Sequence, residues 1–196
     1  MWVKVCGMTT AAAVEAALAL RLDAIGFVFA PSVRQVEPAR AAALAAPARG
    51  RVSCVAVTLH PTQAQVDEIL RVFRPDALQT DIEDLERLQL PQSLARLPVV
   101  RAGRTPPVLP PRVLFEGQRS GTGTRADWDA AQAVSCQTQL ILAGGLDAQN
   151  VAQAIGTVHP FGVDVSSGVE SQPGIKSAEK IAEFVAAARA AMPGVE

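Results

Sequence analysis

Short apolar runs alternate with alanine-rich stretches from one end of the chain to the other. Runs such as "DAIGFVFA" and "RVSCVAVTL" are rich in β-branched residues and are typical of buried strands. Stretches such as "AAAVEAALAL" have the composition of helices, and Thr10 is suited to cap the first of them. Towards the C-terminus, we expect helices from Asp147 to Ile155 and from Ser177 to about Ala191. The repeated order of strand and helix predicts βα units around a parallel sheet.

The number of strand-like runs decides between two parallel architectures. The runs are residues 3–5, "DAIGFVFA", "RVSCVAVTL", "DALQ", "LPVVRA", "PRVLFE", "QLILAGG" and "FGVDVSSG". Eight such runs with helices between them favour a closed (β/α)₈ TIM barrel over an open doubly wound sheet. Between the fifth and sixth runs, "GRTPPVLPPR" holds four prolines in ten residues, which prevents a helix of any length. We therefore expect a barrel whose fifth helix is reduced or missing.

Composition narrows the class of protein. With 196 residues, 49% of them hydrophobic, the chain suits one domain over residues 1–196. The formal net charge is −1 and no basic run occurs, which argues against nucleic acid as a partner. The sequence shows no leader pattern and no apolar run of membrane-spanning length, so we expect a cytoplasmic protein without a membrane partner. Cys6, Cys54 and Cys136 form neither a disulfide framework nor a metal-binding pair, so reduced thiols are expected.

The residues that follow each strand are the candidates for chemistry, because the active sites of such barrels lie at the carboxyl ends of the strands. The loops after the seventh and eighth strands are glycine-rich, and their backbone N–H groups are suited to bind phosphate. "SGTG", from Ser120 to Gly123, is expected to be a flap or an additional phosphate contact rather than a nucleotide-binding motif. The candidates at these ends are Cys6, Gly7, Arg34, Gln79, Thr80, Asp81, Glu116, Gly144, Gly145, Ser166, Ser167 and Gly168.

A phosphorylated small molecule is the ligand that these loops predict, and proton transfer is the chemistry that the other candidates predict. No cluster of metal ligands stands out, and His60 and His159 are expected to have structural roles, so neither a metal nor a cofactor is expected. Cys6 precedes a helix start at the rim, where a depressed pKa would make its thiolate available as a base. With Glu116 nearly across the barrel as a proton donor, this arrangement suits a sugar-phosphate isomerase.

Five fragments, in one order and at comparable separations, carry a resemblance to a known family. They are "KVCGMT", "DAIGFVFAPSVRQV", "GTGTRADW", "LAGGLDAQNV" and "GVDVSSGVESQPGIK". The set is similar to phosphoribosylanthranilate isomerase of tryptophan biosynthesis. The resemblance implies a (β/α)₈ barrel that converts N-(5′-phosphoribosyl)anthranilate to 1-(2-carboxyphenylamino)-1-deoxyribulose 5-phosphate, an Amadori rearrangement, without a cofactor.

The resemblance also implies roles for individual residues. Cys6 would be the general base that takes the proton from C2′ of the ring-opened Schiff base. Arg34 would hold the anthranilate carboxylate. The glycine loops after the seventh and eighth strands would bind the 5′-phosphate through Gly144, Gly145, Ser167 and Gly168. To the substrate-binding set we add Gln79, Gly121, Asp164 and Ser166.

Two positions depart from the family's pattern. Glu116 stands where the family usually has the aspartate that acts as general acid on the furanose oxygen, and glutamate adds a methylene. "QTDI" stands where the family usually has Gln-Leu-His-Gly after the fourth strand, so Asp81 is a rival acid or a partner that compensates for the longer Glu116. We favour Glu116 as the acid.

Two alternative functions stay open on the sequence. One is a related sugar-phosphate isomerase on the same barrel, such as one acting on an aminoimidazole ribonucleotide or on both substrates. Such relatives usually carry a carboxylate where Cys6 lies. The other is a catalytically inactive barrel that binds phosphorylated ligands, which the altered acid and the proline-rich gap would permit. A monomer or a homodimer is expected in each case.

Overall fold

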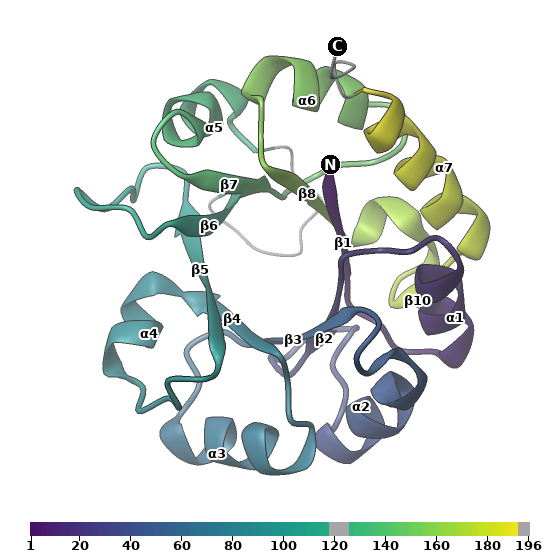
Figure 1. The fold of residues 1–196 in the computed structure, drawn as a ribbon, viewed down its shortest axis with the longest axis vertical. Coiled ribbons are helices and arrows are strands. Elements are labelled where there is room, and N and C mark those ends of the chain that lie inside the picture. Colours follow the sequence, from purple (N-terminus) through teal and green to yellow (C-terminus); the bar gives the residue numbers. More distant parts are fainter. Residues whose placement is uncertain (118–125, 192–196) are drawn as a thin grey trace.

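Eight parallel strands close into a barrel with helices around it (Figure 1). The structure is a computed structural model and describes residues 1–117 and 126–191. Each strand pairs with the next along the chain, and the last pairs with the first, as the eight-strand pattern predicts. The strands are β1 (Trp2–Cys6), β2 (Ala24–Val28), β3 (Ser53–Val57), β4 (Ala77–Asp81), β5 (Ala95–Arg101), β6 (Arg112–Glu116), β7 (Gln139–Leu142) and β8 (Gly162–Val165).

Helices follow every strand of the barrel except β5. They are α1 (Ala11–Ala19), α2 (Pro38–Ala45), α3 (Gln63–Val72), α4 (Ile82–Arg87), α5 (Trp128–Ser135), α6 (Val151–Val158) and α7 (Ala178–Ala190). Two 3₁₀ turns (Ala46–Ala48 and Ser167–Val169) and a small hairpin of β9 (Glu170–Gln172) and β10 (Ile175–Lys176) complete the described elements. Residues 102–111, between β5 and β6, contain no helix, which confirms the prediction from the four prolines.

Local sequence explains where two of these helices begin. The Thr10 hydroxyl accepts the backbone N–H of Ala13 and so caps α1, as predicted. α6 begins at Val151, four residues later than expected. The Asp147 carboxylate accepts the backbone N–H groups of Gln149 and Asn150, which forms a local turn before the helix.

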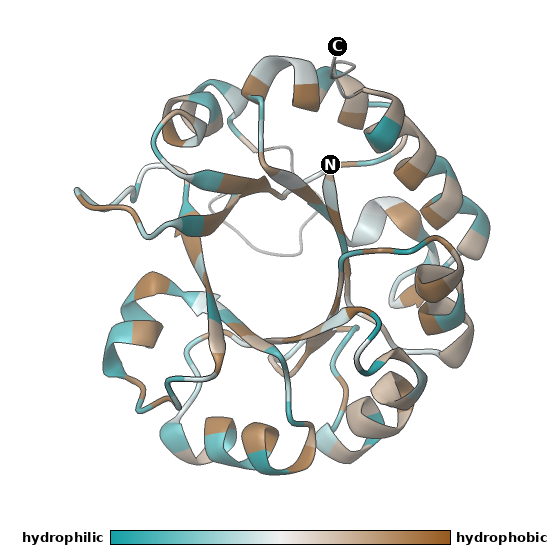
Figure 2. Ribbon diagram, viewed as in Figure 1, coloured by the Kyte–Doolittle hydropathy of each residue, from teal (hydrophilic) through white to brown (hydrophobic). Residues whose placement is uncertain are grey.

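The strand alternation divides the core into an outer and an inner part. The outward residues of β5 and β6, among them Val100, Val113 and Phe115, are buried in the main core, and Leu109 of the proline-rich segment packs against that core. This segment thus covers the strands where a helix is missing. The helices that cover the other strands mix hydrophobic and hydrophilic residues along their length (Figure 2). Inside the barrel lie two small apolar clusters, Leu97, Val99, Leu114, Ile141 and Ala143, and Ala24, Val55 and Ala77.

No helix among the described residues combines the length and the apolar character that a membrane crossing requires.

Candidate active site

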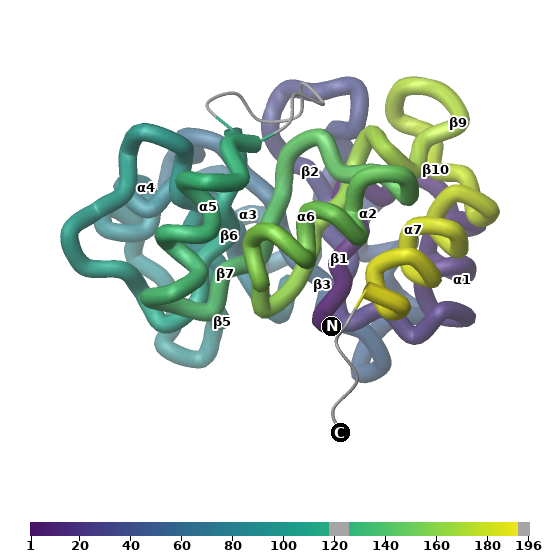
Figure 3. The backbone as a smooth tube through the Cα atoms, turned by 90° about the horizontal axis from the view of Figure 1, so that it is seen from above, coloured from purple at the N-terminus to yellow at the C-terminus, as the bar shows by residue number. Residues whose placement is uncertain are grey.

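A cavity of about 370 Å³ opens at the carboxyl ends of the strands. In Figure 3 the N-terminus, which precedes β1, lies at the lower side of the barrel, and the β9 hairpin, which follows β8, lies at the upper side. Because side chains alternate along a strand, one parity of each strand faces the barrel interior. The polar strand residues that line the cavity are Cys6, Gln79, Asp81, Arg101, Glu116 and Asp164.

Cys6 lies at the end of β1 on the cavity wall and is 7% exposed. Gly26 of β2 leaves room for the Cys6 side chain. A Cβ at position 26 would lie 3.0 Å from the Cys6 sulfur and 3.3 Å from Cε of Lys4. Burial raises the pKa of the Cys6 thiol, and the positive charges of Lys4 and Lys176 only partly oppose this effect. The prediction of a depressed thiol pKa is therefore wrong for the free protein.

Lys4 is a buried cation one strand repeat below Cys6. Its ammonium donates a hydrogen bond to Oδ1 of Asp164 at 2.8 Å, and its side chain is 0% exposed. Burial acts to lower the pKa of Lys4, but the Asp164 carboxylate and Cys6 raise it by more, so the group stays charged. Asp164 lines the cavity as expected, but its described partner is this lysine. The sequence analysis missed Lys4, although a lysine of the same parity as Cys6 within an apolar strand is a usable signal.

Arg34, the predicted carboxylate ligand, is held in place by Glu170 at the start of β9. Its Nε and Nη2 donate to the two carboxylate oxygens at 2.7 and 2.9 Å. Lys176 donates to the same carboxylate at 2.8 Å and to the Ser166 carbonyl at 2.9 Å. Burial acts to raise the pKa of Glu170, but the hydrogen bonds and charges of Arg34 and Lys176 lower it to about 2. Gly7, with φ 81°, lets Arg34 pass close, because a Cβ there would lie 2.6 Å from Cδ of the arginine.

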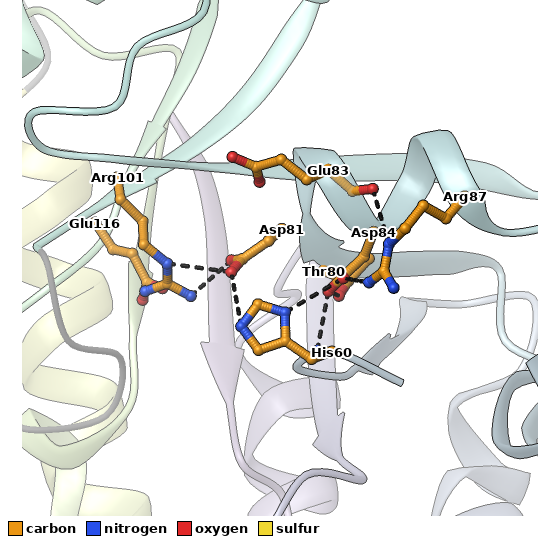
Figure 4. Close-up of polar contacts among 8 residues, drawn as sticks. All are labelled: His60, Thr80, Asp81, Glu83, Asp84, Arg87, Arg101 and Glu116. Atoms are coloured by element: carbon orange, nitrogen blue, oxygen red, sulfur yellow. Dashed lines mark hydrogen bonds and ion pairs between the residues drawn. The ribbon is translucent and has the colours of Figure 1, made fainter. Parts of the chain in front are cut away.

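The two acid candidates, Asp81 and Glu116, lie on either side of Arg101 (Figure 4). Nη1 of Arg101 donates to Oε1 of Glu116 at 2.7 Å. Nη2 and Nε of Arg101 donate to the two oxygens of Asp81 at 2.6 and 3.3 Å. Both carboxylates and the arginine line the cavity. The sequence analysis named both carboxylates but missed the arginine between them.

The glycine loops lie at the same opening. Gly144 and Gly145 adopt positive φ values of 92° and 65° and line the cavity together with Ser166 and Ser167. Gly168 packs between the loops, since a Cβ there would lie 2.0 Å from the Leu146 carbonyl oxygen. Within the described part of the chain, the backbone N–H groups of Gly145, Ser167 and Gly168 donate no hydrogen bond. The predicted contact Gly121 and the rest of "SGTG" lie outside the described residues.

Gln79 of β4 adds a polar side chain to the cavity wall. The residue is 6% exposed and lines the cavity, and its Oε1 accepts no hydrogen bond from the described residues. A buried acceptor of this kind is suited to a hydroxyl or N–H group of a ligand.

The two histidines lie at opposite ends of the barrel. His60, in the loop after β3, places its Nδ1 3.3 Å from Oδ1 of Asp84 and its Nε2 3.8 Å from Oδ2 of Asp81. His159 ends α6 with a left-handed backbone, φ 50°, at the amino end of β8. His60 is thus part of the ion-pair network behind Asp81, whereas His159 has its place in a helix terminus.

Comparison with known proteins agrees with this geometry. The family model described as N-(5′phosphoribosyl)anthranilate (PRA) isomerase matches residues 3–187. The chain belongs to the phosphoribosylanthranilate isomerase family. A member of this family from Rhizobium rhizogenes (strain K84) is 35% identical, over 97% of this chain and 96% of that protein. The chain is therefore an enzyme of the isomerase class.

Solved structures of phosphoribosylanthranilate isomerases share the fold. The enzyme from Thermus thermophilus has a TM-score of 0.83 at 27% identity and covers 97% of this chain and 99% of its own. A second structure, with a TM-score of 0.80 at 26% identity, covers 97% of this chain and 99% of its own. That structure is a complex with reduced 1-(o-carboxyphenylamino)-1-deoxyribulose 5-phosphate.

Proposed function

We propose that this chain converts N-(5′-phosphoribosyl)anthranilate to 1-(2-carboxyphenylamino)-1-deoxyribulose 5-phosphate in tryptophan biosynthesis, with Cys6 as general base and Glu116 as general acid. The observation that carries this proposal is that a thiol, a carboxyl group and two glycine loops line one cavity of about 370 Å³. A proton donor, a proton acceptor and an anion site are the groups that an aldose–ketose rearrangement of a sugar phosphate requires.

Binding of the two ends of the substrate comes first. The backbone N–H groups of Gly145, Ser167 and Gly168, which donate to no described residue, would donate to the 5′-phosphate, as such groups at glycine loops do. Arg34 would pair with the anthranilate carboxylate, since a guanidinium binds carboxylates through paired hydrogen bonds. Gln79 would accept a hydrogen bond from a ribose hydroxyl. Two ends held in this way leave the sugar carbons between Cys6 and Glu116.

Proton transfers then follow at the ring oxygen, at C2′ and finally at C1′. Glu116 gives a proton to the furanose ring oxygen, the C1′–O bond breaks, and the anilino nitrogen forms the Schiff base. Cys6 takes the proton from C2′, and the resulting enolamine becomes the ketone when C1′ gains a proton and the C2′ hydroxyl loses one. Lys4 and Lys176 would stabilise the thiolate, because their positive charges act on Cys6.

The positive charge of the Schiff-base intermediate would oppose the effect of burial on the thiol pKa. Burial disfavours the thiolate in the free protein. A protonated Schiff base would bring a positive charge beside the sulfur and would favour the thiolate when it is needed. Asp164 would act by keeping Lys4 in place.

The same proposal covers the setting of the reaction. It treats residues 1–196 as one barrel domain that works without a cofactor, in the cytoplasm, as a monomer or a homodimer. Light scattering of the purified protein would measure the oligomeric state directly.

Turnover of the purified protein tests the proposal. The fluorescence of N-(5′-phosphoribosyl)anthranilate should fall as the protein converts it. The chain should also rescue a tryptophan auxotroph. An aminoimidazole ribonucleotide substrate should not be turned over, and its turnover would favour the related isomerase instead. Folded protein that converts neither substrate would overturn the proposed activity and favour a binding barrel.

A further inference from the structure

Arg101 occupies the end of β5, between the two strands that carry the acid candidates. In the sheet register it lies beside Glu116 of β6, while Asp81 of β4 pairs with Val99 two residues earlier. Its side chain is 14% exposed, and those of Asp81 and Glu116 are 9% and 13% exposed. The guanidinium therefore lies between two carboxylates that are largely shielded from solvent.

Among the contacts between described residues, the arginine donates to both oxygens of Asp81 and to one oxygen of Glu116. Asp81 receives two hydrogen bonds, at 2.6 and 3.3 Å, one on each oxygen. Glu116 receives a 2.7 Å hydrogen bond on Oε1. A planar guanidinium can serve two acceptors in fixed directions, which a lysine ammonium cannot do as well. The contact with Asp81 therefore holds Arg101 in place, and the contact with Glu116 orients the Glu116 carboxyl group.

Asp81 is itself supported from the side opposite Arg101 (Figure 4). His60 places its Nε2 3.8 Å from Oδ2 of Asp81 and donates its backbone N–H to Asp84 at 2.9 Å. Asp84 also accepts a hydrogen bond from the Thr80 hydroxyl at 2.8 Å and pairs with Arg87. The network thus ties Asp81 to α4 and to the loop after β3.

We propose that Arg101 is a positioning residue that holds the carboxyl group of Glu116 where it reaches the substrate, and that Asp81 anchors Arg101 and is not the proton donor. This inference rests on the proposed function, because it assigns the acid of that reaction. Glutamate has more rotatable bonds than aspartate, so a contact that restricts its rotamers matters more for a glutamate acid than for an aspartate acid. A misplacement of about 1 Å can lower a rate about a hundredfold.

A double-mutant cycle tests this inference. Arg101→Met should lower kcat about tenfold to a hundredfold, with little change in KM, because the acid is misplaced while the substrate is still bound. In a Glu116→Gln background the same change should have almost no further effect, because an arginine that acts through Glu116 has nothing left to position. Independent effects that multiply would show that Arg101 acts on the substrate directly, and would overturn the inference.

The Asp81 variant separates anchor from acid. Asp81→Asn should lower kcat less than Glu116→Gln does, and Arg101→Lys should restore part of the rate lost in Arg101→Met. Asp81 would be the acid if Asp81→Asn lowered kcat as much as Glu116→Gln does, and if Arg101→Met caused no further loss in the Asp81→Asn background. Failure of the proposed function is distinguishable, because the wild-type protein would then show no turnover.

An exposed arginine provides the matched control. Arg71 pairs with Glu68 on the surface of α3, at a distance of 2.6 Å, and does not line the cavity. Arg71→Met should leave kcat and KM unchanged. If Arg101→Met does not fold, as judged by circular dichroism, Arg101→Lys in the wild-type and Glu116→Gln backgrounds completes the same cycle.

Discussion

Two ion-pair clusters flank the cavity, and they have opposite compositions. At the β2–β8 side, two cations, Arg34 and Lys176, share one carboxylate, Glu170. At the β4–β6 side, two carboxylates, Asp81 and Glu116, share one cation, Arg101. In each cluster, a single group of one charge binds two groups of the opposite charge. One side of the cavity therefore has an excess of positive charge, and the other has an excess of carboxylates.

This difference fits the two tasks of the proposed reaction. An excess of positive charge suits the anionic groups of the substrate. The β4–β6 side instead carries both candidate proton donors, Asp81 and Glu116, with Arg101 in contact with each of them. The comparison therefore assigns binding to one side of the cavity and proton donation to the other.

Removal of the proposed acid, Glu116, should cause the largest loss of activity among the changes on the β4–β6 side. Glu116→Gln keeps the shape of the side chain but cannot give up a proton, so kcat should fall about 10²- to 10⁴-fold. Steady-state kinetics by anthranilate fluorescence would measure this. A kcat within a factor of three of the wild type would transfer the role of acid to another group.

Removal of Arg34, the proposed carboxylate-binding residue on the β2–β8 side, should change KM rather than kcat. Arg34→Gln should raise KM about tenfold to a hundredfold, because a charged hydrogen bond contributes about 1.5–3 kcal/mol. The value of kcat should change much less than in Glu116→Gln. Arg71→Gln on the surface of α3 is the matched control. An unchanged KM would show that Arg34 does not contact the substrate.

Neutralisation of Glu170 should have a smaller effect that sharpens the comparison. Glu170→Gln leaves Arg34 in place but less firmly oriented, so KM should rise about fivefold, the effect of one neutral hydrogen bond. An effect on kcat alone would contradict a role in orienting Arg34.

The pH dependence of stability provides a separate readout of the same residue. The folded pKa of Glu170 is about 2, below its usual value of 4.5. The stabilisation by its carboxylate is therefore complete above pH 4.5 and is lost as the pH falls towards 2. The difference in Tm between the wild type and Glu170→Gln should shrink over this range. A constant difference would show that the ion pairs do not stabilise the fold.

Alkylation of Cys6 should show the smallest effect, a change in the shape of a pH profile. Because burial raises the pKa of the Cys6 thiol above its usual value, the rate of reaction with iodoacetamide should rise about tenfold per pH unit between pH 7 and 9. The exposed Cys136 is replaced by serine, and mass spectrometry locates the modified residue. A plateau below pH 8 would show a depressed thiol pKa instead.

The fold followed from local patterns, and the site did so only in part. The eight strands and the gap at the prolines are visible because apolar runs and proline act locally. Cys6 and Glu116 could be predicted to lie at the cavity because they end strands that the pattern indicates. Arg101 and Lys4 were missed because their partners lie on other strands, 20 and 160 residues away, and only closure of the barrel brings them together.

The direction of the Cys6 pKa also escaped sequence reasoning. A position before a helix start favours a thiolate, but burial in the completed barrel has the opposite and larger effect. The start of α6 was misplaced for a related reason, since the turn at Asp147 depends on hydrogen-bond geometry that composition does not show.

Single-turnover kinetics of Cys6→Ala test the central claim most directly. The protein is mixed in excess with N-(5′-phosphoribosyl)anthranilate, and the loss of fluorescence is followed alongside substrate affinity. The sulfur on the cavity wall should prove indispensable, so the conversion rate should fall about 10²- to 10⁴-fold while binding and folding persist. Conversion by Cys6→Ala at the rate of the unaltered chain would contradict the account, because the C2′ proton would then go to another base.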